Sequence, residues 1–290
     1  MRRGTCAAIA AACLSIAASV ASAANLYSNA SANPAIPALN PQAFAKNGTA
    51  APAGAFWSEC QNNTGDTTVA NSTSGYSAFR NAAQTSNFRL ADDFTVPAGG
   101  WTLNGASFYA YRTGQAVSSS PFLEAYVQIW NGAPNAGGAV IYGDTTTNVL
   151  ASSTFANTYR IFNTLVPPTA TGTTRGIFEN QVNLNVTLAP GTYWIDWTYK
   201  LTTDTFTSFS PNATVEGTRG LPGWNALQWG GTSWTALTDT GINQQGTTAN
   251  SPVNQDMPFL LRGTVAPEPS SLAVLGIGAV GMLRRSRRRD

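Results

Sequence analysis

Short runs of alternating hydrophobic and polar residues fill the chain from Phe56 to Val265, separated by clusters of Gly, Pro, Asn, Ser and Thr. The clearest run is "VNLNVTL" at 182–188, in which Val and Leu alternate with Asn and Thr. A period of two places successive side chains on opposite faces of a β-strand. Short β-prone runs between turn residues predict the full set of strands, which is 88–96, 101–111, 124–130, 139–143, 158–162, 182–188, 192–199, 226–229 and 258–265.

The residues between two of these runs indicate how the strands are joined. The link "APG" at 189–191 has the turn chemistry that reverses a chain, so the sequence predicts a hairpin over residues 182–199. The second strand of this pair presents different side chains on its two faces, with Tyr193, Ile195 and Trp197 on one and Trp194 and Asp196 on the other. One of these faces must pack inside the protein.

No stretch before the C-terminal tail has the period of an amphipathic helix. The sequence therefore predicts an all-β fold, with two packed antiparallel sheets in a jelly-roll-like sandwich over residues 56–264. The lack of a repeat of 20–50 residues argues against a propeller or a solenoid. The preceding residues 24–55 are rich in Ala, Asn and Pro and are expected to be flexible, apart from a short edge strand at Leu26 and Tyr27.

Residues 1–23 have the parts of a secretory signal peptide with a short signal helix. An Arg-Arg pair precedes an apolar region at 7–20 and a small-residue cleavage site, Ala21-Ser22-Ala23. The arginine pair lacks the flanking pattern of twin-arginine export, and Cys13 lies too early for a lipoprotein site. We therefore expect the secretion machinery to export the chain and a peptidase to cut after Ala23.

The chain ends with an apolar segment that is short for a transmembrane helix. The run at 272–283 has 12 residues and covers roughly 18 Å as a helix, against a hydrocarbon core of about 30 Å. Pro267, Glu268 and Pro269 precede this hydrophobic helix, and an arginine cluster follows it at Arg284, Arg285, Arg287, Arg288 and Arg289. By the positive-inside rule these arginines retain that end in the cytoplasm. The alternative, a buried terminal helix of a soluble protein, fits five arginines poorly.

These three parts, in this order within residues 265–290, resemble the PEP-CTERM sorting signal of Gram-negative bacteria. In that family an exosortase, a membrane-embedded cysteine transpeptidase, recognises the motif and cleaves near it. The resemblance implies a transient inner-membrane anchor, followed by release to the cell surface or the extracellular space. It also implies a link to exopolysaccharide, which the organisms that use this signal typically make.

A second resemblance concerns residues 56–264, which are similar to a class of secreted bacterial β-sandwich domains that carry C-terminal sorting signals. It rests on the segments "LADDFTVPAGGWTLNGASFYAY", "VQIWNGAPNAGG", "GTYWIDW" and "MPFLLRG". This similarity supports the fold and the export, and it transfers no catalytic residue.

The positive charge of the chain belongs to its two ends. Seven of the 16 Lys and Arg and two of the 14 Asp and Glu lie there, which leaves nine positive and 12 negative residues, a net charge of −3, in residues 24–266. A mildly acidic domain gives no support for nucleic-acid binding, which needs a basic surface. The chain has no histidine, and this excludes Ser-His-Asp triads, Cys-His pairs and His-ligated metals. Cys60 is the one cysteine outside the signal peptide and is expected to be a small, semi-buried structural residue.

Carboxylates offer two kinds of candidate site, neither with a specific motif. Asp92 and Asp93 are adjacent on a predicted strand and point to opposite faces, which excludes them as a matched catalytic pair. Each is a candidate ligand, with Asp144, for a structural calcium ion, which takes 6–8 oxygen ligands; the alternative is pairing with Arg89 or Arg112. No other cofactor is expected. A glycosidase needs two acids about 5–10 Å apart, and the available acids are Glu59, Glu124, Glu179, Asp196 and Glu216.

Aromatic residues give a more specific indication of a binding site than the carboxylates do. The segment "GWNALQWGGTSW" at 223–234 places Trp224, Trp229 and Trp234 in a glycine-rich setting beside Asn225 and Gln228. Indole rings stack on the apolar face of a sugar ring, and planar amides bind sugar hydroxyls. The sequence therefore predicts a candidate glycan-binding site here, with core packing of the indoles as the alternative.

Taken together, these patterns predict an exported, non-enzymatic protein of the cell surface or the extracellular matrix. Its expected role is that of a structural, adhesive or glycan-binding module linked to exopolysaccharide and biofilm. The competing interpretations are a secreted carbohydrate-active hydrolase and a permanently membrane-anchored surface protein.

Overall fold

The computed structural model describes residues 24–29, 39–60, 73–81, 87–165, 171–203, 208–215, 219–242 and 251–265. These ranges contain strands and no helix, which confirms the all-β prediction; the two helices predicted at the ends of the chain lie outside them. The strands are β1 (Ala24–Ser28), β2 (Phe56–Glu59), β3 (Tyr76–Ser77), β4 (Phe79–Arg80), β5 (Asn87–Val96), β6 (Trp101–Arg112), β7 (Phe122–Trp130), β8 (Val140–Gly143), β9 (Leu150–Ile161), β10 (Gly176–Leu188), β11 (Gly191–Leu201), β12 (Ser208–Ser210), β13 (Leu227–Trp229), β14 (Trp234–Ala236), β15 (Thr238–Asp239), β16 (Val253–Asn254) and β17 (Phe259–Val265). Every predicted run overlaps one of these strands.

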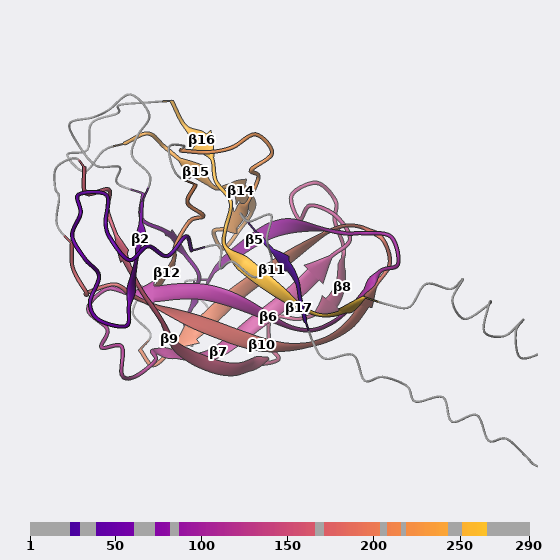
Figure 1. Ribbon diagram of the computed structural model, residues 1–290. Coiled ribbons are helices and arrows are strands. Elements are labelled where there is room, and N and C mark those ends of the chain that lie inside the picture. Colours follow the sequence, from indigo (N-terminus) through magenta and orange to yellow (C-terminus); the bar gives the residue numbers. More distant parts are fainter. Residues whose placement is uncertain are drawn as a thin grey trace, which may run out of the picture.

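Two large sheets contain most of these strands (Figure 1). The eight-stranded sheet has the order β1-β17-β6-β10-β9-β2, with β12 paired to β6 and β3 paired to β12. The seven-stranded sheet has the order β14-β13-β5-β4-β11-β7-β8, and β15 pairs with β16 separately. The prediction of purely antiparallel sheets is wrong at two places, because β2 runs parallel to β9 and β4 runs parallel to β11. Parallel neighbours need a long connection, and long stretches of chain separate both pairs.

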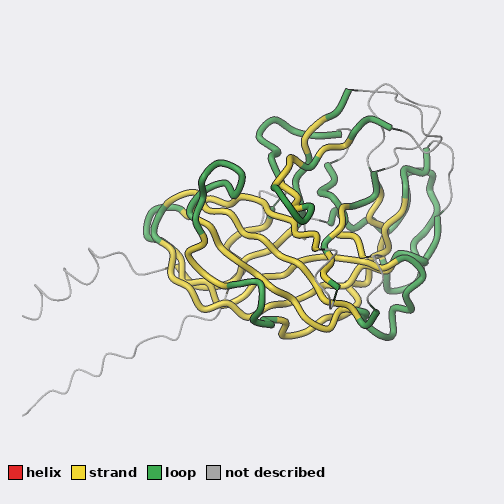
Figure 2. The backbone as a smooth tube through the Cα atoms, turned by 180° about the vertical axis from the view of Figure 1, so that it is seen from behind, coloured by secondary structure: helices red, strands yellow, loops and turns green. Residues whose placement is uncertain are grey.

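One hydrophobic core lies between the inward faces of the two large sheets. Trp197 of β11 stacks on Phe108 of β6, with ring centroids 4.5 Å apart, and both residues are fully buried. Figure 2 shows the long strands curving around this shared interior like part of a barrel, with many of the loops gathered at one end. The jelly-roll-like sandwich itself stays a prediction.

The predicted hairpin over residues 182–199 is wrong. β10 pairs with β6 and β9 in the eight-stranded sheet, whereas β11 pairs with β5 and β7 in the seven-stranded sheet. The link between β10 and β11 therefore carries the chain from one sheet to the other. Residues 97–100 make the same crossing between β5 and β6, and the two links touch, since a Cβ atom on Gly100 would lie 2.6 Å from the carbonyl oxygen of Leu188. Turn residues alone do not distinguish a hairpin from such a crossing.

The described parts of residues 24–55 are hydrogen-bonded to the rest of the domain. β1 pairs antiparallel with β17, which confirms the short edge strand expected at Leu26 and Tyr27. Gln42 forms an antiparallel bridge with Trp57 of β2, and Leu39 and Ala45 are buried. These parts are therefore packed against the sheet, in contrast to the flexible segment expected from their composition.

Candidate functional site

Alternation along β11 divides its side chains between the shared core and the outer face of the seven-stranded sheet. Ile195 and Trp197 are fully buried in the core, so Trp194 and Asp196 point the other way, as the sequence predicts. A small hydrophobic cluster covers Trp194 on that outer face, with side chains from β5, β7, β13 and β14. β5, β7, β11 and the adjacent strands β13 and β14 come from separate regions of the sequence, and the sheet brings them together.

Four tryptophans gather on this outer face, and we call them the tryptophan face: Trp130, Trp194, Trp229 and Trp234. Trp229 and Trp234 lie opposite each other on β13 and β14, with ring centroids 5.8 Å apart. Trp234 meets Trp130 of β7 edge-on at 6.3 Å, and Trp194 lies in register with Trp130. Trp194 is buried, whereas the other three indoles are half-buried and reach the surface.

A buried polar network supports the tryptophan face from within the sheet. The carboxylate of Asp196 accepts a hydrogen bond from Nε of Arg89 at 2.8 Å and one from Nε1 of Trp130 at 2.5 Å. Arg89 also donates to the side chain of Gln128, and its guanidinium carbon lies 5.2 Å from the centre of the Trp234 ring. Burial raises the pKa of Asp196 above its ordinary value, and the charge of Arg89 opposes that shift. The network thus orients two of the half-buried indoles, Trp130 and Trp234, through one ion pair.

The structure places the five residues of the predicted glycan site in four different surroundings. Trp229 and Trp234 belong to the tryptophan face. Gln228, between Leu227 and Trp229 on β13, points away from this face and donates from Nε2 to the carbonyl oxygen of Ser77 at 2.9 Å. Trp224 is buried, and its backbone N–H bonds the carbonyl oxygen of Leu221. The amide that accompanies the indoles is Gln128, which the sequence analysis missed together with Trp130 and Arg89.

Asn225 lies beside the tryptophan face through Asp93. Its side chain hydrogen-bonds the carboxylate of Asp93, which is in register with Trp194 on the neighbouring strand. Its backbone N–H also donates to Oδ1 of Asp256 at 2.9 Å. Burial raises the pKa of Asp93, and the bond from Asn225 opposes the shift.

The three candidate calcium ligands have separate surroundings. Asp92 is fully buried, accepts hydrogen bonds from Nδ2 of Asn29 at 2.6 Å and from the backbone of Met257 at 2.8 Å, and has a pKa raised well above its ordinary value by burial and by Asp256. Asp144 lies in an exposed loop and accepts the backbone and hydroxyl bonds of its own neighbours. Among the residues that the structure describes, no group of three acidic, histidine or cysteine side chains is arranged to hold a metal ion. Arg89 pairs with Asp196 rather than with either member of the Asp92-Asp93 pair.

The described acids that a hydrolase would use are each engaged by different partners. Glu59 accepts bonds from Lys46 and Thr164, Glu124 from Tyr126 and Lys200, and Glu179 from Ser107 and Arg262. Asp196 belongs to the network below the tryptophan face, and Glu216 lies outside the described residues. The structure brings no two of these four described acids to a shared partner.

Cys60 is free and buried at the end of the β2 segment. Burial raises the pKa of its thiol, although Arg160 and Arg175 oppose the shift. A buried thiol of raised pKa is unreactive, which agrees with the structural role expected from the sequence.

Comparison with known proteins identifies the C-terminal segment. Residues 265–289 match the family of the PEP-CTERM protein-sorting motif. The match begins at Val265, the last residue of β17, so the sorting signal follows directly on a strand of the eight-stranded sheet. The motif implies export to the bacterial cell envelope or surface, with an exosortase as the processing partner. No curated protein and no solved structure matches the chain.

Most of the predicted sorting features lie outside the described residues. They include the cleavage site at Ala21 and Ala23, the Pro267-Glu268-Pro269 motif, the apolar helix and the arginine cluster. In the ranges that the structure does describe, no helix has the length and apolar character needed to cross a membrane.

Proposed function

We propose that the mature protein is a non-enzymatic glycan-binding module of the cell surface or extracellular matrix, and that it adheres to exopolysaccharide through the tryptophan face. The producing cell is expected to be a Gram-negative bacterium in which the sorting signal anchors the precursor transiently in the inner membrane. The architecture we propose for the domain is a jelly-roll-like two-sheet sandwich, supported by the core that both sheets share.

The observation that carries this proposal is the tryptophan face itself. Three half-buried indoles from three different strands reach one surface, although the protein already has a separate aromatic core. Exposed aromatic clusters on soluble domains typically mark binding surfaces, and indoles bind the apolar face of a sugar ring. The side chain of Gln128, half-buried in the same row of the sheet as Asp196, supplies an amide for hydroxyl recognition.

The arrangement favours binding because it is held in place before any ligand arrives. Trp130 is fixed by its bond to Asp196, and Trp234 by its contacts with Trp130, Trp229 and Arg89. Rigid aromatic anchors lose little conformational entropy on binding, which increases the affinity.

The test is retention of the protein on the secreted polysaccharide of the producing bacterium, measured by affinity electrophoresis. Trp229→Ala should weaken retention about tenfold or more, because truncating an aromatic anchor commonly costs 2 kcal/mol or more. Leu123→Ala, which shortens an exposed apolar side chain near the start of the same sheet's β7, is the control and should leave retention unchanged. Equal retention of wild type and Trp229→Ala, with both folded, would contradict the proposal.

A further inference from the structure

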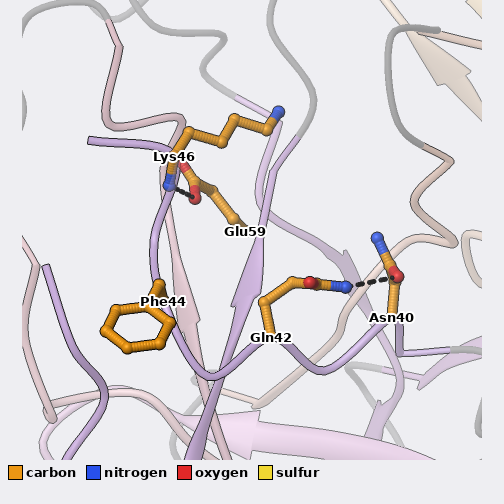
Figure 3. A pocket seen from close by; sticks show the side chains of 5 residues that line it. All are labelled: Asn40, Gln42, Phe44, Lys46 and Glu59. Carbon is orange, nitrogen blue, oxygen red and sulfur yellow. Dashed lines mark hydrogen bonds between the residues drawn. The ribbon is translucent and has the colours of Figure 1, made fainter. Parts of the chain in front are cut away.

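A polar pocket lies at the edge of the eight-stranded sheet that β2 forms. It has a volume of about 380 Å³ and is lined by Asn40, Gln42, Phe44, Lys46 and Glu59 (Figure 3). This volume falls in the range of small-molecule sites, about 300–1,000 Å³. The pocket shares no lining residue with the tryptophan face, so it is a separate feature of the molecule.

Backbone hydrogen bonds hold the segment that forms this pocket. Gln42 exchanges both of its backbone bonds with Trp57 at 2.8 Å, and Ala51 donates to the carbonyl oxygen of Ala43 at 2.8 Å. The four lining residues of the segment are at alternate positions, and a period of two brings alternate side chains to one face. Leu39 and Ala45, at intervening positions, are buried against the domain. The pocket is therefore built on paired backbone rather than on a loose loop.

Phe44 is unusual for an aromatic residue of a packed segment, because 63 % of it is exposed. An antiparallel bridge to Ala50 holds the backbone at this point, and the Phe44 side chain lines the pocket. Figure 3 shows the ring on one side of the pocket, with Gln42 and Asn40 along another side. An exposed ring held beside polar groups is a stacking surface.

The two amides are aligned with each other. Nε2 of Gln42 donates to Oδ1 of Asn40 at 2.9 Å. This bond uses one of the two amide protons of Gln42 and the side-chain oxygen of Asn40. The side-chain oxygen of Gln42 therefore remains as an acceptor, and the amide N–H groups of Asn40 remain as donors. Asn40 has a backbone φ of 47°, a left-handed conformation that asparagine tolerates and that is common at functional positions.

The charges around the pocket balance. Lys46 contributes one ammonium group and Glu59 one carboxylate. The carboxylate is buried and holds the pocket's structure, because it accepts bonds from the backbone N–H of Lys46 at 2.7 Å and from the hydroxyl of Thr164 at 2.7 Å. One aromatic ring, two aligned amides and no net charge suit a ligand that is uncharged, ring-shaped and rich in hydroxyls.

We propose that this pocket is a second carbohydrate site, which takes a neutral pyranose unit with its apolar face on Phe44 and its hydroxyls on Asn40 and Gln42. The site extends the proposed glycan-binding function, although it does not depend on the tryptophan face. Two sites on different sheets allow one molecule to hold two polysaccharide strands, which increases retention through effective concentration.

The test is calorimetric titration of the full-length chain, purified in mild detergent, with neutral tetrasaccharides of glucose, mannose, galactose and N-acetylglucosamine and with anionic tetragalacturonate. At least one neutral tetrasaccharide should bind, and Phe44→Ala should weaken that binding about tenfold. Gln42→Ala should weaken it as well. Phe56→Ala, an exposed phenylalanine on β2 that does not line the pocket, is the matched control and should bind like wild type.

Three results would overturn the second site: no neutral tetrasaccharide binds, only tetragalacturonate binds, or Phe44→Ala binds like wild type. The variant Trp229→Ala separates this inference from the proposed function. If tetrasaccharide binding survives Phe44→Ala but is lost in Trp229→Ala, the tryptophan face is the single site and only the second site fails. If polysaccharide retention survives Trp229→Ala while Phe44→Ala loses tetrasaccharide binding, the pocket is the carbohydrate site and the proposal for the tryptophan face fails.

Discussion

The ion pair below the tryptophan face makes a quantitative prediction for the variant Arg89→Met. The side chains of Arg89 and Asp196 are 11 % and 1 % exposed. Methionine keeps much of the apolar stem of Arg89 and removes its charge. The carboxylate of Asp196 then stays buried without a positive partner, and it keeps the hydrogen bond from the indole N–H of Trp130. Breaking a buried pair on one side costs about 3–5 kcal/mol, against a typical total stability of about 5–15 kcal/mol. We expect urea unfolding of Arg89→Met to show a loss of this size.

The size of the loss should depend on pH. In the variant, burial still raises the pKa of Asp196, whereas the opposing effect of Arg89 is gone. A carboxyl group whose folded pKa exceeds its unfolded value binds protons more tightly in the native state, so stability increases as pH falls through the interval between the two values. The difference between wild type and Arg89→Met should therefore narrow on acidification from pH 7.

The double variant Arg89→Met/Asp196→Leu is the control, because it removes both charges. It should recover at least half of the lost stability, since an apolar pair of similar volume replaces a buried ion pair at little cost. A loss below about 1 kcal/mol for Arg89→Met, or the same loss at pH 5 and pH 7, would refute the reasoning about burial.

Two further predictions concern buried carboxylates and the end of β8. Burial and repulsion by Asp256 raise the pKa of Asp92, and burial raises that of Asp256 to about 6. The free energy of unfolding should therefore increase as pH falls from 7 towards 5, and Asp92→Asn should flatten this dependence in urea titrations. A wild-type stability that decreases on acidification would contradict this reasoning. Gly143→Ala should lower the melting temperature by several degrees, because the φ of Gly143 is +76° and the added Cβ would lie 2.1 Å from the carbonyl oxygen of Val127. The matched control is Gly114→Ala, where φ is +81° and the added Cβ would meet open space. Its melting temperature should fall by less, because backbone strain is the one cost there.

The alternation of hydrophobic and polar residues predicted the strand at 182–188 correctly, because it reflects the local geometry of a single chain segment. The run at 182–188 shows this, with Val182, Leu184 and Leu188 buried and Asn183 and Asn185 exposed. Strand pairing cannot be predicted from this alternation, because it depends on which strand edges are already paired with other strands. The link after β10 has hairpin chemistry, yet both edges of β10 are occupied, and the chain crosses to the other sheet.

The tryptophan face could be predicted only in part for the same reason. Trp229 and Trp234 are neighbours in the sequence and in space. Trp130 joins them through the pairing of β7 with β11, which no local pattern encodes. Gln228 is predicted beside the indoles, but adjacent side chains of a strand point to opposite faces, so it lies on the other side of β13 from Trp229.

The central claim is that this chain is an exported substrate of an exosortase, and the intact mass of the protein recovered from the producing bacterium tests it most directly. We expect the mass of a chain that begins after Ala23 and ends within the sorting motif at 265–289, before the arginine cluster. A mass that extends to Asp290 would contradict it.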